Sequence, residues 1–141
     1  MDLPKGYGVC ILGCGVAPMI VSTLMGGQVM KARKKYDVNY PNLYAVPGVH
    51  KMADEFNNIQ RGHQNMFETS IFYVPLSLIT GLKHPLTIGL GGFAYCLGTW
   101  TFQSNYMTGA KKRNDGVVAK FKYVGLLTTL ITSIKVAIGL L

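Results

Sequence analysis

An uncharged stretch near the amino terminus constrains this chain more than any other feature. From Tyr7 to Met30, 24 consecutive residues contain no Asp, Glu, Lys or Arg. A helix needs about 20 apolar residues to cross the hydrocarbon core of a bilayer. The stretch is also longer than the apolar region of a cleavable signal peptide. We therefore predict a retained membrane span over residues 7–30.

Three further stretches have the same character. The stretch from Pro85 to Met107 has no charge, residues 123–141 carry only Lys135, and residues 66–82 carry only Glu68. The sequence therefore predicts an all-α fold, an integral membrane four-helix bundle. We expect one transmembrane domain over residues 1–141, with spans at about 7–30, 62–82, 85–107 and 121–141.

The net charge of +8 would suit a nucleic-acid partner, but the positions of the charges argue against one. Six Lys and Arg residues lie from Lys31 to Arg61 and five from Lys111 to Lys122, whereas the rest of the chain carries three. Loops rich in Lys and Arg stay on the cytoplasmic side of a membrane, so both basic segments are expected to face the cytosol. The cluster at residues 31–35 fits anchoring to anionic lipid as well as ligand binding.

The three cysteines, Cys10, Cys14 and Cys96, all lie within apolar stretches. Their odd number and membrane location argue against a disulfide framework. Cys10 and Cys14 share one helix face, but no His or other third ligand accompanies them. We therefore expect no metal site.

The second span begins with a polar stripe. Arg61, Asn65 and Glu68 stand at i, i+4 and i+7, which places them on one helix face at increasing depth in the membrane. A charge at this depth must be paired or face a wet cavity. One interpretation is a structural ion pair, in which Glu68 binds Arg61 or Lys135. The other is a site for a peptide-like zwitterion, in which Arg61 binds a carboxylate, Glu68 an ammonium group and Asn65 an amide.

A second polar group closes the third span. Tyr106 and Arg113 are expected on the same cytosolic side as Arg61 and the cluster at residues 31–35. Cations that converge at one level repel one another. A bound anion at the membrane boundary would relieve this repulsion.

Taken together, these motifs resemble the MAPEG family (membrane-associated proteins in eicosanoid and glutathione metabolism), most closely its type-three microsomal glutathione S-transferases. The resemblance spans nearly the whole chain. It rests on Lys31-Ala32-Arg33-Lys34-Lys35-Tyr36 with Tyr40-Pro41, on Phe56-Asn57 with Ile59-Gln60-Arg61-Gly62-His63-Gln64-Asn65 and Glu68, and on Tyr106 with Thr108-Gly109. The second of these motifs is the specific one.

The resemblance implies a homotrimer in the endoplasmic reticulum membrane, with the mitochondrial outer membrane as the alternative location. Glutathione, as co-substrate, would bind between subunits at the cytosolic boundary. The residues that would hold it are Arg33, Arg61, Asn65, Glu68 and Tyr106, with Arg33 supplied by the neighbouring subunit. Arg113 would face the sulfur and favour the nucleophilic thiolate.

The implied activity is conjugation of glutathione to lipophilic electrophiles, together with glutathione-dependent reduction of lipid hydroperoxides. The alternative is a non-catalytic lipid-binding or activating protein of the same family. The chain departs from the family pattern at Thr69, Ile71, Thr99 and Phe102, where relatives carry tyrosine, proline, arginine and tyrosine, respectively. The third loop also aligns one residue short, so Lys112 is an alternative to Arg113.

Overall fold

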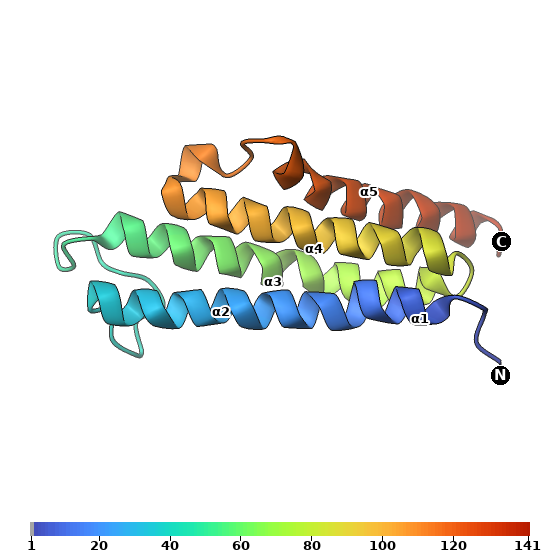
Figure 1. Cartoon of the computed structure of the whole chain (residues 1–141), viewed down its shortest axis with the longest axis horizontal. Coiled ribbons are helices and arrows are strands. Elements are labelled where there is room, and N and C mark those ends of the chain that lie inside the picture. Colours follow the sequence, from blue (N-terminus) through green and yellow to red (C-terminus); the bar gives the residue numbers. More distant parts are fainter. Residues whose placement is uncertain (1) are drawn as a thin grey trace.

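The computed structural model describes residues 2–141 as an all-helical bundle of four long rods (Figure 1). Three segments in series form the first rod, and a short 3-10 helix, η2, precedes the last. The elements are α1 (Tyr7–Cys10), the π-helical η1 (Ile11–Val16), α2 (Ala17–Tyr36), α3 (Ala53–Gly81), α4 (Pro85–Thr108), η2 (Ala110–Lys112) and α5 (Val117–Ile138). The prediction of four long helices is confirmed.

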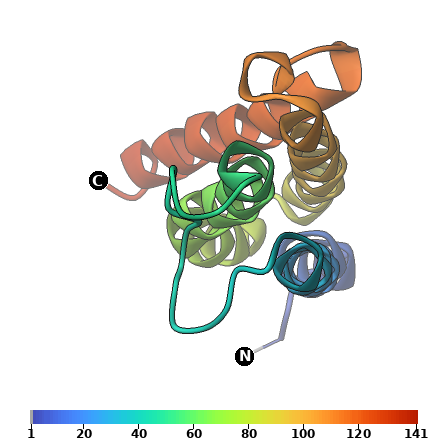
Figure 2. The same ribbon diagram turned by 90° about the vertical axis from the view of Figure 1, so that its left-hand side faces the viewer.

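The loops sort to the two ends of the bundle as their charge predicts. The segments that join α2 to α3 and α4 to α5 lie at one end, and both termini lie at the other with the α3–α4 turn (Figure 1). Viewed from the basic end, α3 lies between α2 and α5 (Figure 2). α4 packs against α2, α3 and α5. The cations of the two basic segments therefore gather at one end of the molecule, whereas Lys83 lies in the α3–α4 turn at the other.

Local signals in the sequence set the helix ends. Pro85 opens α4 at a position where its missing N–H is not needed. α4 closes at Gly109, whose φ of 145° is accessible to glycine alone without strain. Three basic residues occupy the last turn of α2, where they complement the negative end of the helix dipole: Arg33, Lys34 and Lys35.

The first rod contains an irregularity just before Pro18. Proline removes one backbone hydrogen bond, which is a common cause of a kink in a helix. The structure places the π-helical segment η1 immediately upstream, and α2 resumes at Ala17. Wider turns of this kind commonly relieve a helix at such a point.

Two of the helices are long and apolar enough to cross a membrane, namely Tyr7–Tyr36 and Val117–Ile138. Their outward surfaces are rich in exposed apolar side chains, such as Met19 at 66% and Leu127 at 55% exposure. Apolar surface of this extent calls for lipid or protein cover. That α3 and α4 also cross the bilayer stays a prediction.

The three cysteines are free and buried, as the sequence indicated. Thiols behave as small apolar groups in such surroundings. Cys14 Sγ donates to the carbonyl of Ile88 at 3.3 Å, which joins η1 to α4. The cysteines therefore serve the packing of the first rod against α3 and α4.

Glycine permits the closest helix approach, between α4 and α5. A Cβ added at Gly98 would lie 2.7 Å from the Lys122 Cα and 2.7 Å from the Phe121 carbonyl carbon. Gly98 is therefore a small interface residue between α4 and α5. Small residues at such crossings let helix backbones come together in lipid.

We predict that Gly98→Ala lowers the unfolding temperature of the purified protein in detergent. The added methyl group must push α5 away, which costs about 1–3 kcal/mol. Gly27→Ala is the matched control, because nothing lies within 4 Å of a Cβ added at Gly27. Equal unfolding temperatures for the two variants would contradict the close α4–α5 contact.

Candidate functional site

The polar stripe on α3 contains an ion pair. Arg61 Nη1 donates to Glu68 Oε1 at 2.5 Å, and Arg61 Nη2 donates to Glu68 Oε2 at 3.2 Å. Of the two ion pairs that the sequence allowed for Glu68, the structure has the one with Arg61, and across residues 2–141 it is the only ion pair. A guanidinium is not deprotonated in proteins at ordinary pH, so Arg61 stays charged.

The ion pair is open to its surroundings. The side chains of Arg61 and Glu68 are 41% and 43% exposed, respectively. An exposed ion pair contributes only about 0–1 kcal/mol, because water competes for both charges. Both groups are therefore available to a ligand at little cost.

Asn65, the third member of the stripe, faces α5. Its Oδ1 accepts a hydrogen bond from the ammonium group of Lys122, which lies 4.4 Å from the centre of the Phe102 ring. Lys122 is only 2% exposed. The sequence analysis grouped Lys122 with the second basic segment, and the structure places it inside α5, which already begins at Val117. The sequence did contain a signal for the burial of Lys122. It stands three residues before Gly125 and seven before Thr129, so the three residues share one face of α5, and this face is buried.

Tyr106 joins the same group through an aromatic contact. Its ring meets the edge of the Phe102 ring, with the centroids 5.7 Å apart. Phe102 in turn lies beneath Lys122. A continuous series of contacts thus runs from Tyr106 through Phe102 and Lys122 to Asn65, beside the ion pair.

The loop that joins α2 to α3 folds against α3 through residues that lie outside the stripe. The Tyr44 hydroxyl donates to Gln64 Oε1 on α3. Asn57 fixes the same loop through both of its amide atoms, since its Oδ1 accepts from the Ala45 N–H at 2.8 Å and its Nδ2 donates to the Ala45 carbonyl at 3.0 Å. Sequence reasoning gave these three side chains no role.

Arg33 holds its own loop in this single chain. Its Nη1 donates to the carbonyl groups of Val38 at 3.1 Å and Asn42 at 2.8 Å, and its guanidinium lies 4.4 Å from the centre of the Tyr40 ring. These contacts do not reach the polar stripe of the same chain. They leave open the prediction that a neighbouring subunit contributes Arg33.

Arg113 lies in the exposed connection between η2 and α5. Its Nη1 donates to the Ala110 carbonyl at 2.7 Å, and Lys112 in the last turn of η2 is exposed as well. Neither cation contacts the polar stripe. The structure therefore brings Arg61, Asn65, Glu68 and Tyr106 together, and leaves Arg113 and Arg33 outside this group.

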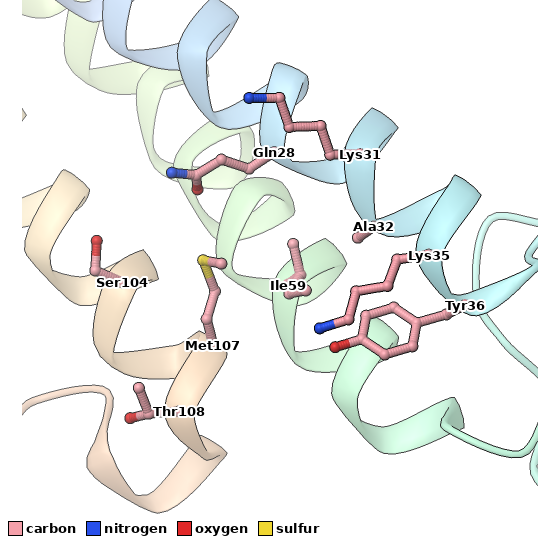
Figure 3. Close-up of a pocket in the computed structure, with 9 residues that line it drawn as sticks. All are labelled: Gln28, Lys31, Ala32, Lys35, Tyr36, Ile59, Ser104, Met107 and Thr108. Carbon is pink, nitrogen blue, oxygen red and sulfur yellow. The ribbon is translucent and has the colours of Figure 1, made fainter.

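A separate cavity of about 530 Å³ opens between α2 and α4, over α3 (Figure 3). It has an apolar floor that includes Ile59 and Met107, and Lys31 and Lys35 stand on its α2 side. No member of the polar stripe lines it. Within residues 2–141, no three His, Cys, Asp or Glu side chains gather where a metal ion could bind.

Comparison with known protein families gives a match that covers most of the chain. A model of the MAPEG family matches residues 11–134. These residues include all four long helices except the ends of the first and last, and every residue of the polar stripe. The family is membrane-bound and includes glutathione transferases and related proteins. The chain belongs to the MAPEG family.

Proposed function

We propose that this protein is a membrane-bound glutathione transferase, similar to the type-three microsomal enzymes, that conjugates glutathione to lipophilic electrophiles. The observation that carries the proposal is the open Arg61–Glu68 ion pair beside Asn65. A cation, an anion and an amide on one accessible helix face match the groups of a small peptide-like zwitterion.

When glutathione binds, Arg61 and Glu68 would each exchange the other for an oppositely charged group of the ligand, so both charges stay paired. Glutathione carries two carboxylates and one ammonium group. Arg61 would turn from Glu68 to a ligand carboxylate, and Glu68 would bind the ligand ammonium group. Two ion pairs thus replace one, and the pair that opens was weak because it was exposed.

The partly exposed stripe also supports a homotrimer with the site between subunits. A charged face at this depth is unfavourable against lipid, so a neighbouring chain or a wet cavity must cover it. Arg33 of the neighbouring subunit would complete the site around glutathione. Tyr106 would close it from the end of α4.

Arg113 would act on the sulfur. A guanidinium beside the thiol stabilises the thiolate, which is the nucleophile. In conjugation, the thiolate attacks the electrophilic atom and displaces a leaving group or adds to a double bond. To reach the sulfur, Arg113 must release the Ala110 carbonyl that it holds in the free chain.

The same thiolate would reduce lipid hydroperoxides. Its sulfur attacks the outer peroxide oxygen, which gives a sulfenic acid and releases an alcohol once the alkoxide takes a proton. A second glutathione then converts the sulfenic acid to a disulfide and water. No metal takes part in these steps.

The membrane setting fits these substrates. The apolar outer faces of the helices would deliver a lipophilic electrophile or hydroperoxide from the bilayer, and the basic end would meet cytosolic glutathione. Proximity of the two bound reactants lowers the barrier further. We place the protein in the endoplasmic reticulum membrane with its basic loops in the cytosol, and the mitochondrial outer membrane is the alternative.

The second candidate function is non-catalytic binding of a lipid. The cavity at α2 and α4 favours it, because an apolar floor beside Lys31 and Lys35 suits a lipid with an anionic head. A lipid-binding protein has no need of the open ion pair on α3. Turnover of glutathione separates the two candidates.

We predict that the purified protein in detergent turns over glutathione with an aromatic electrophile and, in a separate assay, with a lipid hydroperoxide. Conjugate formation and disulfide formation are the respective readouts. Protein denatured by heat before the assay is the control. No turnover with either substrate, together with binding of a fatty-acid probe, would favour the lipid-binding function instead.

We predict that Arg113→Ala mainly lowers kcat, by about 10–1,000-fold, because the thiolate loses its stabilising cation. The apparent thiol pKa of bound glutathione, measured from the pH dependence of the rate, should rise. Lys112→Ala removes a cation from the adjacent exposed position and is the matched control. A larger rate loss for Lys112→Ala would assign the role to Lys112.

A further inference from the structure

Lys122 is a buried cation without a carboxylate partner. It lies on the inward face of α5 and is 2% exposed. Its ammonium group has three N–H donors, and its one hydrogen-bond partner among residues 2–141 is Asn65 Oδ1. The Phe102 ring, 4.4 Å away, offers only its π face. Donors buried in this way call for a further acceptor.

The charge of the site is unbalanced as a result. Arg61 and Glu68 neutralise each other, so Lys122 leaves this group with a net charge of +1. The remaining acidic residues are exposed and lie outside this group: Asp2, Asp37, Asp54, Glu55 and Asp115. Glutathione with an ionised thiol carries a net charge of −2, and with a neutral thiol −1. The excess cation therefore matches the ligand of the proposed function.

Lys122 also fixes which way Asn65 presents its amide. An ammonium group can only donate, so the Asn65 atom that it contacts must be the oxygen. The Asn65 N–H donors are then directed away from Lys122. Asn65 can therefore donate to a carboxylate or carbonyl oxygen of a ligand, whereas its own oxygen already accepts a hydrogen bond from Lys122.

We propose that Lys122 is a positioning residue of the glutathione site, which orients the Asn65 amide as a donor and supplies the positive charge that selects an anionic peptide thiol. This inference rests on the proposed function. It assigns part of the selectivity for charge to α5, a helix that contributes none of the site residues expected from the sequence.

A purely structural role for Lys122 makes a different prediction. Replacing a buried charge by an apolar side chain of similar length is often neutral or stabilising in a protein. If Lys122 only filled space beside Phe102, then Lys122→Met would keep both folding and glutathione affinity. A loss of affinity without a loss of stability identifies the positioning role.

The experiment compares steady-state kinetics and unfolding temperatures of the wild type, Lys122→Met and Lys122→Arg in the full-length protein. For Lys122→Met we expect KM for glutathione to rise about tenfold, since a hydrogen bond to a charged group is lost. KM for the electrophile and the unfolding temperature should stay near the wild-type values. Lys122→Arg should recover most of the affinity. Lys120→Met removes an exposed cation two residues away and should behave as the wild type.

A double-mutant cycle tests the link to Asn65. Because Lys122 acts partly through that amide, Asn65→Ala and Lys122→Met should raise KM for glutathione by less together than the product of their separate effects. The Lys122→Gln variant serves in place of Lys122→Met if the latter does not fold, since it keeps donors but not the charge.

Two outcomes would overturn the inference in distinguishable ways. If the wild type turns over glutathione and KM for Lys122→Met lies within twofold of the wild-type value, the positioning role is wrong and the proposed function stands. If the wild type neither turns over nor binds glutathione, the proposed function fails, and the inference fails with it.

Discussion

The Arg61–Glu68 ion pair is the interaction on which the basic end of this molecule depends. Both charges sit where α3 passes from a polar to an apolar sequence, and neither could remain there alone. The pair is nevertheless exposed, so its two charges neutralise each other without closing off either group. A rigid, buried pair would offer nothing to a ligand. The openness of this pair is what connects the fold to a function.

Packing between helices brings the rest of the site to this pair. Gly98 lets α4 and α5 approach at the level of Lys122, and this contact directs the lysine inward over Phe102 to Asn65. Tyr106 then extends the group toward the loops. A glycine in one helix thus determines where a cation from another helix can act.

The sequence predicted the features that depend on local pattern. The uncharged stretches gave the long helices, the distribution of Lys and Arg predicted which loops lie together, and the spacing of the stripe predicted the pair of Arg61 with Glu68 as one alternative. The position of Lys122 was missed, because its neighbours in sequence are loop cations and only the α4–α5 crossing buries it. The hydrogen bonds of Arg33 to its own loop were missed as well. They too depend on tertiary structure, because they form only when residues 38–42 fold back onto α2.

In the proposed function, the open ion pair on α3 binds glutathione. Equilibrium binding of labelled glutathione to the purified protein, without electrophile, tests it most directly. We expect saturable binding, weakened about tenfold by Glu68→Gln because the ligand ammonium loses its anion. Glu55→Gln, which removes an exposed carboxylate from the first turn of the same helix, should bind as the wild type does. Absence of saturable binding, or equal affinities for the Glu68 and Glu55 variants, would contradict the account.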